Sequence, residues 1–596
     1  MMYFTSRFDI NAYPSVNVTL QTRPPMNLRC LYLCLITTFL IMGCHKSPDI
    51  SVGPAKTAIS TKGMVVTAHP LATQVGLDIL RQGGNAADAA IAVQFALAVV
   101  YPRAGNLGGG GFLVYRDSAG HVASLDYREK APLTARRDMY LDSLGNVIPG
   151  LSTTDILAAG VPGTVAGLAE TYKRFGSIKP WSRLVEPAIR LAREGFRLTQ
   201  EEAERLNYYQ EDFKRVNSAP IPFFSDSAWK EGDLLIQKDL AQTLDIIAEE
   251  GRDGFYKGPN AQAITKLSAE RHGMITQEDL SAYESKWRPP VNLHWRGYSL
   301  YTMGPPSSGG IVMGQILGML ENVLIDSLGF NHPANMHALI EAERRAYADR
   351  AEYLGDADFI TVPSDSLLNP GYLRKKFSDF KPGKASESKS IRQEKFRFAR
   401  DHFETTHFSI VDGDGNAASV TTTLNDNYGC KVWVPGGGYF LNNEMDDFSA
   451  KPGVPNIFGL IGGDANAIAP AKRMLSSMSP TIIEKDGHLC MVLGSPGGST
   501  IITTVLQVFL NTAAYGMDLE QAVNAPRYHH QWLPEEVLVE KNGFDPVILD
   551  SLKAMGHSIQ TLDRLGDVEA IWVEPKNILR GVADIRGGDD TAAGLR

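Results

Sequence analysis

The sequence predicts a layered α/β fold, in which buried helices pack on sheets, and three observations support it. Residues 63–68 (GMVVTA) form a short apolar run typical of a buried strand. Residues 70–100, interrupted by GGN at 83–85, are rich in small residues, and the part that resumes at residue 86 has strong helix formers and no exposed charged face. Residues 111–115 (GFLVY) and 122–126 (VASLD) are predicted to form two paired strands across the turn DSAG. A helix without a polar face needs cover on both sides, so helices and sheets should lie in stacked layers.

Length and composition point to a large globular protein. The 596 residues are 43% hydrophobic and 21% charged, which excludes intrinsic disorder and a disulfide-stapled miniprotein. The 58 basic and 67 acidic residues give a net charge of −9, and no block of Lys and Arg is dense enough to bind a phosphate backbone. Nucleic acid is therefore not an expected partner.

The first 44 residues have the pattern of an export leader. The apolar run at 30–42 has the length of a signal-peptide core and is too short to span a bilayer. It ends in LIMGC, which resembles a bacterial lipoprotein signal cleaved before Cys44. We expect an exported, periplasmic or cell-surface protein anchored through a lipid on Cys44, with ordinary secretion as the alternative. Residues 1–25 fit neither a leader nor a folded element, so Met26 is an alternative start, and residues 45–58 should form a polar tether.

The rest of the chain changes character once, at residue 405. From about 180 to 355 the spacing predicts mostly helix, for example over 237–250 and 336–353. Residues 382–404 are polar and weakly periodic, which predicts a loop. Residues 405–411 and 417–424 then alternate as two strands around the turn DGDGN. We expect a hairpin whose first residue is Thr405.

Several standard catalytic and metal-binding motifs are missing from the sequence. It contains no HExxH, no P-loop and no dinucleotide fingerprint, and GSPGG at 494–498 lacks the GxSxG register. The turn at 412–416 begins like a calcium loop but fails the template at its sixth and twelfth positions. No cysteine or histidine cluster has zinc spacing, and HHQW at 529–532 is assigned to packing. We therefore expect no metal and no cofactor. Cys430 and Cys490 are candidates for a disulfide in an oxidising compartment.

A series of ordered motifs spans about residues 63–594. They are LDYRE at 125–129, GVPGT at 160–164, PPSSGG at 305–310, TTHFS at 405–409, TTTLN at 421–425, NNEMDDFS at 442–449, LSSMSP at 475–480, GSPGG at 494–498, and the closing segment 581–594. Together they resemble the gamma-glutamyltranspeptidase family. The resemblance implies a four-layer αββα sandwich of the N-terminal nucleophile hydrolase type. It also implies a precursor that cleaves itself between Glu404 and Thr405 into a large subunit, 59–404, and a small catalytic subunit, 405–596, which fold as one domain.

The resemblance makes Thr405 the nucleophile. A threonine hydroxyl needs an adjacent base, and cleavage frees the α-amine of Thr405, whose reference pKa is about 7.7 to 8.0. Thr423 matches the residue that hydrogen-bonds this nucleophile and its amine. Gly497 and Gly498 match the backbone donors that stabilise the oxyanion. On composition alone, the other hydroxyl residues of TTHFS remain alternative nucleophiles.

The substrate implied by the resemblance is a γ-glutamyl compound, which carries an α-carboxylate and an α-ammonium at one end. Arg128 matches the carboxylate-binding arginine, whose planar guanidinium suits a two-pronged contact. The remaining matches are hydroxyl donors to the carboxylate, Ser476 and Ser477, and ligands of the ammonium, Asn425, Glu444 and Asp447. The expected enzyme is a gamma-glutamyltransferase and glutathione hydrolase. Its acyl-enzyme would pass to water or to the amine of an amino acid or peptide.

Two further interpretations remain open. One is an amidase of the same fold that acts on another substrate, such as a glutaryl group or poly-γ-glutamate, although a glutaryl group has no ammonium for the matched site to bind. The other is a catalytically silent surface lipoprotein that binds γ-glutamyl compounds, which an intact Thr405 with a full oxyanion motif disfavours. In the lid segment 450–459, Phe458 stands where well-known relatives have tyrosine. A missing hydroxyl predicts a looser lid and more hydrolysis, unless apolar packing holds the ring equally well.

Overall fold

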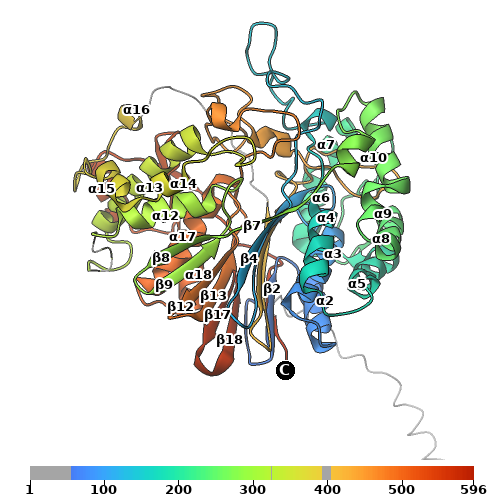
Figure 1. The fold of residues 1–596 in the computed structure, drawn as a ribbon, viewed down its shortest axis with the longest axis horizontal. Coiled ribbons are helices and arrows are strands. Elements are labelled where there is room, and N and C mark those ends of the chain that lie inside the picture. Colours follow the sequence, from blue (N-terminus) through green and yellow to red (C-terminus); the bar gives the residue numbers. More distant parts are fainter. Residues whose placement is uncertain (1–54, 324, 326, 392–404) are drawn as a thin grey trace, which may run out of the picture. The chain divides into compact units, whose positions relative to one another are not determined.

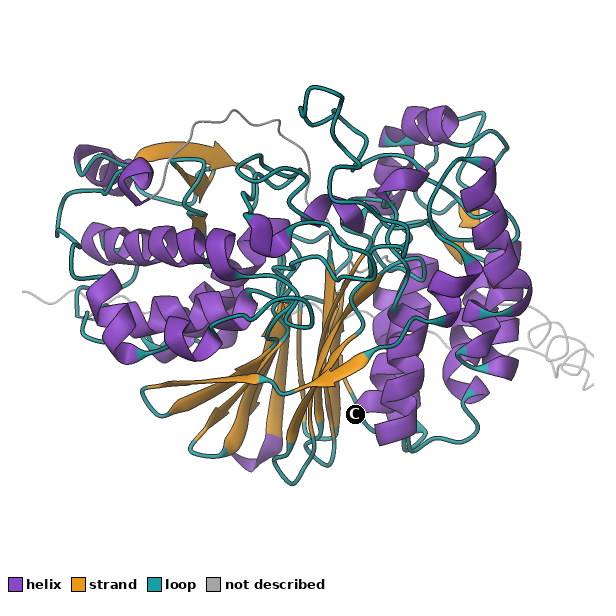
Figure 2. Ribbon diagram, turned by 45° about the horizontal axis from the view of Figure 1, so that its top comes forward, coloured by secondary structure: helices purple, strands orange, loops and turns teal. Residues whose placement is uncertain are grey.

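The computed structural model describes residues 55–391, except 324 and 326, and residues 405–596, all of which belong to one compact unit. The predicted lipidation site Cys44 and the residue before the predicted cleavage, Glu404, lie outside the described residues. The unit has helices on both sides of two face-to-face sheets, as Figures 1 and 2 show. The predicted αββα sandwich is confirmed.

Each large sheet has seven strands with antiparallel neighbours. In spatial order, the first contains β1 (Thr57–Ser60), β18 (Ile578–Ala583), β17 (Glu569–Glu574), β13 (His488–Gly494), β12 (Thr481–Lys485), β9 (Tyr298–Thr302) and β8 (Val291–Trp295). The second contains β19 (Thr591–Gly594), β2 (Gly63–Thr67), β10 (Thr406–Asp412), β11 (Ala417–Thr423), β3 (Gly110–Arg116), β4 (Val122–Asp126) and β7 (Lys286–Arg288). Both sheets therefore combine strands from before and after residue 405.

Helices cover the outer face of each sheet (Figure 1). On the β2–β10–β11 side they are α2 (Pro70–Arg81), α3 (Ala86–Val100), α4 (Thr164–Phe175), α5 (Ser182–Glu194), α6 (Gln200–Tyr208), α7 (Gln210–Val216), α8 (Lys238–Glu250), α9 (Asp253–Tyr256), α10 (Gly258–Glu270) and α11 (Gln277–Ser281). On the β8–β13 side they are α12 (Gly309–Met319), α13 (Pro333–Tyr353), α14 (Ser364–Leu367), α15 (Pro370–Lys376), α16 (Ser388–Ile391), α17 (Ile501–Ala513), α18 (Leu519–Asn524) and α19 (Pro546–Ala554). Two small sheets complete the fold, β14 (Tyr528–His529) with β15 (Glu536–Glu540) and β16 (Ser558–Leu562), and β5 (Phe196–Arg197) with β6 (Leu234–Leu235).

Burial on both faces explains the apolar run of β2. In β2, Val65 packs in the cluster under the helices, whereas Met64 and Val66 pack between the two sheets. A strand buried on both faces reads as a continuous apolar run. Helix α3 is buried along its whole length and begins with a capping box between Asn85 and Asp88. These two elements confirm the layered arrangement expected from the sequence.

The predicted hairpin forms, with Thr406 opposite Thr422 and Val411 opposite Ala417. It lies in the middle of its sheet, between β2 and β3. The predicted strands at 111–115 and 122–126 also pair, as β3 and β4. The helix expected over 70–100 is divided into α2 and α3 where the GGN sequence interrupts it. These elements place the start of β10 at one end of the sandwich.

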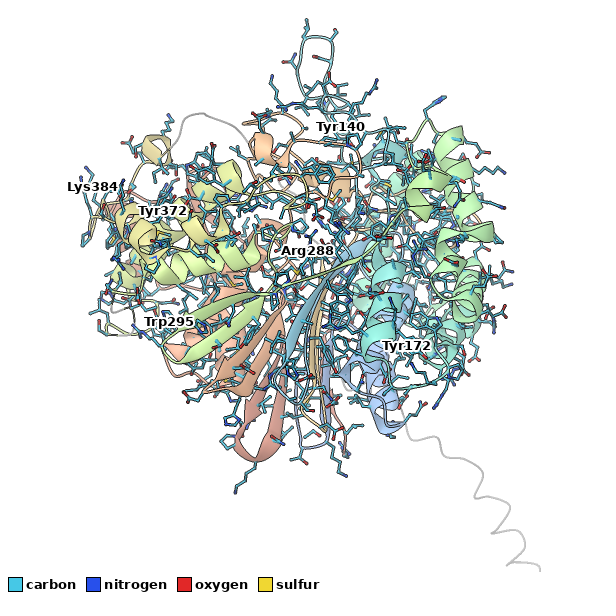
Figure 3. The ribbon with its side chains drawn as sticks, viewed as in Figure 1. Tyr140, Tyr172, Arg288, Trp295, Tyr372 and Lys384 are labelled. Carbon is cyan, nitrogen blue, oxygen red and sulfur yellow. The ribbon has the colours of Figure 1, made fainter. Side chains whose placement is uncertain are left out.

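The prediction of mostly helix over 180–355 was wrong for residues 286–302. This stretch forms β7, β8 and β9, and residues of β8 and β9 alternate between more and less buried positions, a period-2 pattern that the helical interpretation passed over. The chain crosses here from one sheet to the other. Arg288, at the end of β7, lies near the centre of the molecule in Figure 3, and its Nε donates to Asp126 Oδ2 at 2.7 Å.

One other prediction needs correction, and one question that the sequence left open is answered. The polar tether expected over 45–58 ends earlier, because Thr57 and Ala58 already pair with Val582 and Gly581 in β1. Cys430 and Cys490 are both free thiols, because they lie in different apolar clusters on opposite sides of the sandwich. Burial raises the pKa of Cys430 to about 12 and that of Cys490 to about 11, so both stay protonated.

Among the described helices, none is long and apolar enough to cross a membrane.

Candidate active site

A small pocket opens where loops from both halves of the chain meet at the start of β10. Its walls combine residues predicted from the sequence with three apolar neighbours, Leu460, Met478 and Ile501. The predicted residues in the lining are Arg128, Thr405, Thr423, Asn425, Glu444, Asp447, Phe458, Ser476, Ser477 and Gly498. Segments more than 350 residues apart in sequence thus contribute to one site. Gly497, the other predicted oxyanion donor, immediately precedes Gly498 in the chain.

Thr405 lies at the pocket end of the central hairpin. Because Thr406 faces Thr422 across the hairpin, the next register position sets Thr405 beside Thr423. Thr405 is 4% exposed and Thr423 is 2% exposed, so both lie beneath the surface. The Thr423 hydroxyl accepts a hydrogen bond from the amide of Asn425 at 2.7 Å, which fixes this oxygen next to the pocket.

Arg128 is the central cation of the pocket and follows directly after β4. Its backbone is fixed by hydrogen bonds to Asp126 and from the Tyr283 hydroxyl, at 3.0 and 2.8 Å. Its guanidinium donates to Glu444 through Nη1 and to Asp447 through Nη2. Both carboxylates lie on the short helical turn Glu444–Asp447. The predicted carboxylate ligand and two predicted ammonium ligands therefore touch one another.

The pocket holds more negative than positive groups around Arg128. Burial raises the pKa of Glu444 well above its usual value, and Arg128 offsets this only in part. Burial also raises the pKa of Asp447, again against the attraction of Arg128. Behind them, Glu129 lies 3.8 Å from Arg128 and its pKa is raised to about 7 by burial. An added cation would stabilise the charged form of these carboxylates.

Asn425 reaches the pocket through a backbone conformation rare for a residue with a side chain. Its φ is +79°, in the left-handed region that asparagine tolerates better than most residues. The side-chain Nδ2 donates to the carbonyl of Asn443 at 3.0 Å. Asn456 Nδ2 donates to Asp447 Oδ1 at 3.0 Å. Backbone and amide contacts therefore hold two of the ammonium ligands predicted from the sequence.

Ser476 and Ser477 form the wall next to Arg128. The backbone of Ser476 bridges to the PPSSGG turn: its amide donates to Pro306 O and its carbonyl accepts from the Ser308 hydroxyl, at 2.8 and 2.7 Å. The Ser477 hydroxyl accepts from Arg350 Nη2 at 3.2 Å. Both serines are therefore anchored by polar contacts to another part of the chain.

Gly497 and Gly498 begin the helical segment that enters α17. Their φ angles are +132° and +54°, which glycine adopts without strain. A Cβ on Gly498 would lie 2.7 Å from the ring of Phe458. The amides at the start of a helix have no intrahelical partner and carry partial positive charge, which suits a developing oxyanion.

The segment predicted as a lid lies against this glycine pair. Phe458 is 7% exposed, and its ring packs so closely on Gly498 that a side chain there would collide with it. The Phe458 carbonyl accepts a hydrogen bond from Gln531 Nε2 at 3.1 Å. Gln531 Oε1 in turn lies 2.9 Å from His529 Nε2, and His529 is fully buried. The predicted packing role of the HHQW segment is consistent with these contacts.

Sequence reasoning missed three residues that shape the site. Glu129 follows Arg128 directly in the LDYRE motif, so the sequence could have predicted that it lies near the pocket. Arg350 lies on α13 and Gln531 follows β14, and each contacts the pocket through a partner distant in sequence. No motif or spacing pointed to Arg350, whereas Gln531 belongs to the HHQW segment, which was assigned to packing.

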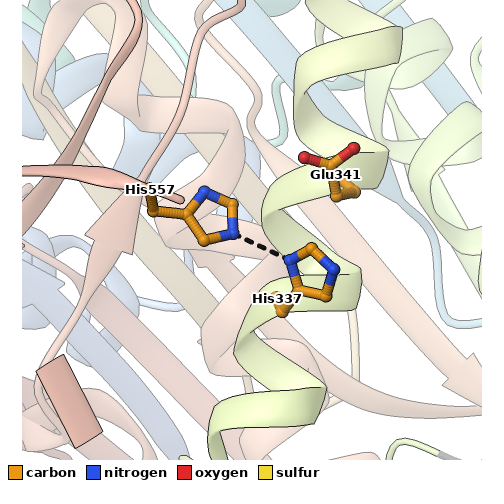
Figure 4. Close-up of side chains that lie close together, drawn as sticks. All are labelled: His337, Glu341 and His557. Carbon is orange, nitrogen blue, oxygen red and sulfur yellow. Dashed lines mark hydrogen bonds between the residues drawn. The ribbon is translucent and has the colours of Figure 1, made fainter. Parts of the chain in front are cut away.

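A cluster away from this pocket contains His337, Glu341 and His557, whose ligand-type atoms lie within 4.8 Å of one another (Figure 4). His337 Nδ1 and His557 Nε2 lie 2.8 Å apart, and His337 Nε2 contacts the Lys381 carbonyl at 3.0 Å. Arg345 Nη1 donates to Glu341 Oε2 at 2.6 Å, so an arginine already neutralises the carboxylate. These contacts form a buried hydrogen-bonded cluster, in which His557 Nδ1 has no hydrogen-bond partner among the described residues.

Comparison with known proteins agrees with the geometry. The gamma-glutamyltranspeptidase family profile matches residues 72–594. The glutathione hydrolase proenzyme of Escherichia coli (strain K12) is 47% identical over 554 residues, which cover 92% of this chain and 95% of that protein. The cephalosporin acylase from Bacillus halodurans superposes with a TM-score of 0.79 at 26% identity, covering 93% of this chain and 99% of that one. Helicobacter pylori gamma-glutamyltranspeptidase gives a TM-score of 0.53 at 48% identity, covering 54% of this chain and 93% of that one. The chain is therefore an enzyme of the gamma-glutamyltranspeptidase family.

Proposed function

We propose that this enzyme transfers the γ-glutamyl group of glutathione and related amides to water or to an amino acid or peptide amine, with Thr405 as the nucleophile. The observation that carries the proposal is the pocket itself, where Thr405 and Arg128 meet the carboxylates Glu444 and Asp447. A hydroxyl stands beside paired groups of opposite charge, as a zwitterionic amide substrate requires. The name of the E. coli relative supports glutathione as the donor.

Maturation supplies the base. Cleavage between Glu404 and Thr405 frees the α-amine of Thr405, which can take the proton of its own hydroxyl. The amine has a reference pKa of about 7.7 to 8.0, so a useful fraction is unprotonated near neutral pH. Thr423, which the hairpin register sets beside Thr405, is suited to hold the hydroxyl and the amine in line.

In the acylation step, the Thr405 oxygen attacks the γ-carbonyl of the donor. The negative charge that develops on the carbonyl oxygen is stabilised by the amides of Gly497 and Gly498 at the helix start. The C–N bond then breaks, and the Thr405 amine returns its proton to the leaving amine. Water or an acceptor amine attacks the resulting ester and regenerates the hydroxyl.

Substrate orientation comes from the charges at the other end of the pocket. The α-carboxylate pairs with Arg128 and accepts hydrogen bonds from Ser476 and Ser477. The α-ammonium takes its place among Asn425, Glu444 and Asp447. Since burial raises the pKa of Glu444 and Asp447, a bound ammonium compensates negative charge that Arg128 alone does not balance.

The acylase interpretation keeps some support, because a cephalosporin acylase shares the fold. The carboxylates of this pocket argue against it, since a glutaryl group has no ammonium to balance the negative charge that Arg128 alone does not offset. A poly-γ-glutamate substrate keeps the same γ-amide chemistry and would be distinguished by comparing polymer and glutathione as donors.

Self-cleavage and catalysis are tested together with Thr405→Ala. The wild type should run as two fragments on a denaturing gel, and mass spectrometry should give the smaller one an N-terminus at Thr405. Thr405→Ala should remain intact and hydrolyse no glutathione, because the attacking oxygen is gone, whereas Thr405→Ser should retain slow processing. An intact, inactive wild type would favour the silent binding lipoprotein, and a different N-terminus would reject Thr405 as nucleophile.

We also propose export with a lipid on Cys44, on the pattern LIMGC that ends the apolar run. Wild-type enzyme should sediment with membranes, and Cys44→Ser should release it with unchanged glutathione hydrolysis. Ordinary secretion is the correct interpretation if the wild type is recovered free in the soluble fraction.

A further inference from the structure

Arg350 is a buried cation at the edge of the active site. It lies in the last turn of α13 and is 4% exposed. Its Nε donates to the Ser308 hydroxyl at 2.9 Å and its Nη2 donates to the Ser477 hydroxyl at 3.2 Å. Both contacts lead toward the wall of the pocket that Ser476 and Ser477 form.

The neighbouring arginines of the same helix behave differently. Arg344 pairs with Glu341 and Glu535, and Arg345 pairs with Glu341 and Asp379. The hydrogen bonds of the Arg350 guanidinium within the described residues go to neutral hydroxyls instead. A buried guanidinium held by hydroxyls keeps most of its positive potential for a further anion.

The charges around Arg350 show which anion it can meet. Burial lowers the pKa of Arg350, the nearby Asp447 opposes this, and the positive charge of Arg128 adds to it. Arg128 lines the pocket, and Arg350 contacts Ser477, which also lines it, so both guanidinium groups lie close to the wall that Ser476 and Ser477 form. An anion bound at this wall would relieve the repulsion between them.

We propose that Arg350 is a positioning and specificity residue for the α-carboxylate of the donor. The Ser477 hydroxyl accepts from Arg350, so its single hydrogen is free to point at the ligand. The Ser308 hydroxyl accepts from Arg350 and donates to the carbonyl of Ser476 at 2.7 Å, so one guanidinium orders both serines. Arg350 thus fixes two hydrogen-bond donors and adds a second positive charge behind them. This inference rests on the proposed function.

The test compares two donors in Arg350→Gln. One is L-γ-glutamyl-p-nitroanilide, and the other is 4-aminobutyryl-p-nitroanilide, which has the same amide and amine but no α-carboxylate. For the first donor, KM should rise about ten- to a hundredfold, the size of one lost charge-assisted contact, while kcat changes little. For the second donor, KM should stay at its wild-type value, because no carboxylate is present for Arg350 to recognise.

Two further variants separate positioning from folding. Arg350→Lys keeps the charge but loses the forked geometry, so its KM should rise less and again only for the carboxylate-bearing donor. Arg345→Lys is the matched control on the same helix and should leave both KM values unchanged. If Arg350→Gln fails to mature, the lysine variant and its control carry the comparison.

A double-mutant cycle tests whether Arg350 acts through Ser477. The combination of Arg350→Gln with Ser477→Ala should raise KM by clearly less than the product of the two single effects, since the residues form one contact. Equal losses on both donors, an unchanged KM with the γ-glutamyl donor, or full additivity would overturn the inference. A wild type without activity on L-γ-glutamyl-p-nitroanilide would instead reject the proposed function.

Discussion

Two buried clusters of arginine and carboxylate have similar ingredients and opposite character. In the pocket, one guanidinium, Arg128, faces Glu129, Glu444 and Asp447. Near the end of the chain, Arg527 and Arg586 both contact Asp584, at 2.5 and 2.9 Å, and Arg586 also grips Glu540 through two nitrogens at 2.5 and 2.6 Å. Among the groups in direct contact, the first cluster has fewer cations than carboxylates, whereas the second is balanced, with two of each.

The carboxyl pKa values express this difference. Burial raises the pKa of Glu444, and the pull of Arg128 does not reverse it. Burial would also raise the pKa of Asp584, but Arg527 and Arg586 outweigh it and hold the value below its usual range. A buried cluster with balanced charges stabilises the fold. A buried cluster with uncompensated negative charge can instead be stabilised by a bound cationic group of a ligand.

The largest effect should come from breaking the balanced cluster. Asp584→Asn leaves two buried guanidinium groups short of a partner, which should cost on the order of 3 to 5 kcal/mol of stability. Chemical denaturation of the variant should show an early midpoint with the wild-type slope. A stable variant with impaired donor binding would mean that the two clusters do not differ in role.

The next effect concerns the pocket cation. Arg128→Lys should mature normally and lose about ten- to a hundredfold in kcat/KM for a γ-glutamyl donor, because an ammonium cannot make a two-pronged carboxylate contact. Steady-state kinetics beside an unfolding curve check both parts. Unchanged kinetics would move the carboxylate site away from Arg128.

A smaller effect is expected at Glu444, where substitution of a buried residue should stabilise the fold at alkaline pH instead of destabilising it. Because the folded-state pKa of Glu444 is raised, its favourable contribution is present below its unfolded value of about 4.3 and is lost as pH rises. Glu444→Gln should therefore unfold at a higher temperature than the wild type at pH 8, with the gain disappearing toward pH 4.

The balanced cluster provides the control for this pH dependence. The folded-state pKa of Asp584 is lowered, so its contribution is present above the unfolded value and is lost as pH falls through the folded value. The deficit of Asp584→Asn should shrink toward acid pH. Parallel pH profiles for the two variants would contradict the contrast between the clusters.

The smallest effect is expected in the lid. Phe458 and Asn425 line the same pocket. If the hydroxyl added by Phe458→Tyr bonds to Asn425, a hydrogen bond worth about 0.5 to 1.5 kcal/mol should raise the ratio of transpeptidation to hydrolysis about two- to tenfold. The ratio is measured at fixed acceptor concentration and pH. A flat or falling ratio would mean that the ring of Phe458 against Gly498 and the bond from Gln531 already hold the segment.

The sequence predicted those parts of the molecule whose cause is local. Strand alternation gave the hairpin that carries Thr405, and ordered motifs gave the residues that line the pocket, as well as the family and its fold. Arg350 could not be found in this way, because it acts through a partner 127 residues away. Gln531 lies in the HHQW segment that was assigned to packing, and its contact with the lid goes through Phe458, 73 residues away. Whether Cys430 and Cys490 pair stayed open in the sequence for the same reason, since spacing in sequence does not give separation in space.

Each large sheet combines strands from before and after residue 405. This arrangement shows how little the peptide bond before Thr405 contributes to holding the two halves together. β10 pairs with β2 on one side, and β11 pairs with β3 on the other, so the chain after residue 405 is hydrogen-bonded into the middle of the chain before it. β1, from the start of the fold, pairs with β18 near its end. A single break at this bond would therefore leave the hydrodynamic size and the native mass unchanged. Neither fragment could dissociate without exposing the interior of both sheets. The two fragments would therefore unfold and be degraded together.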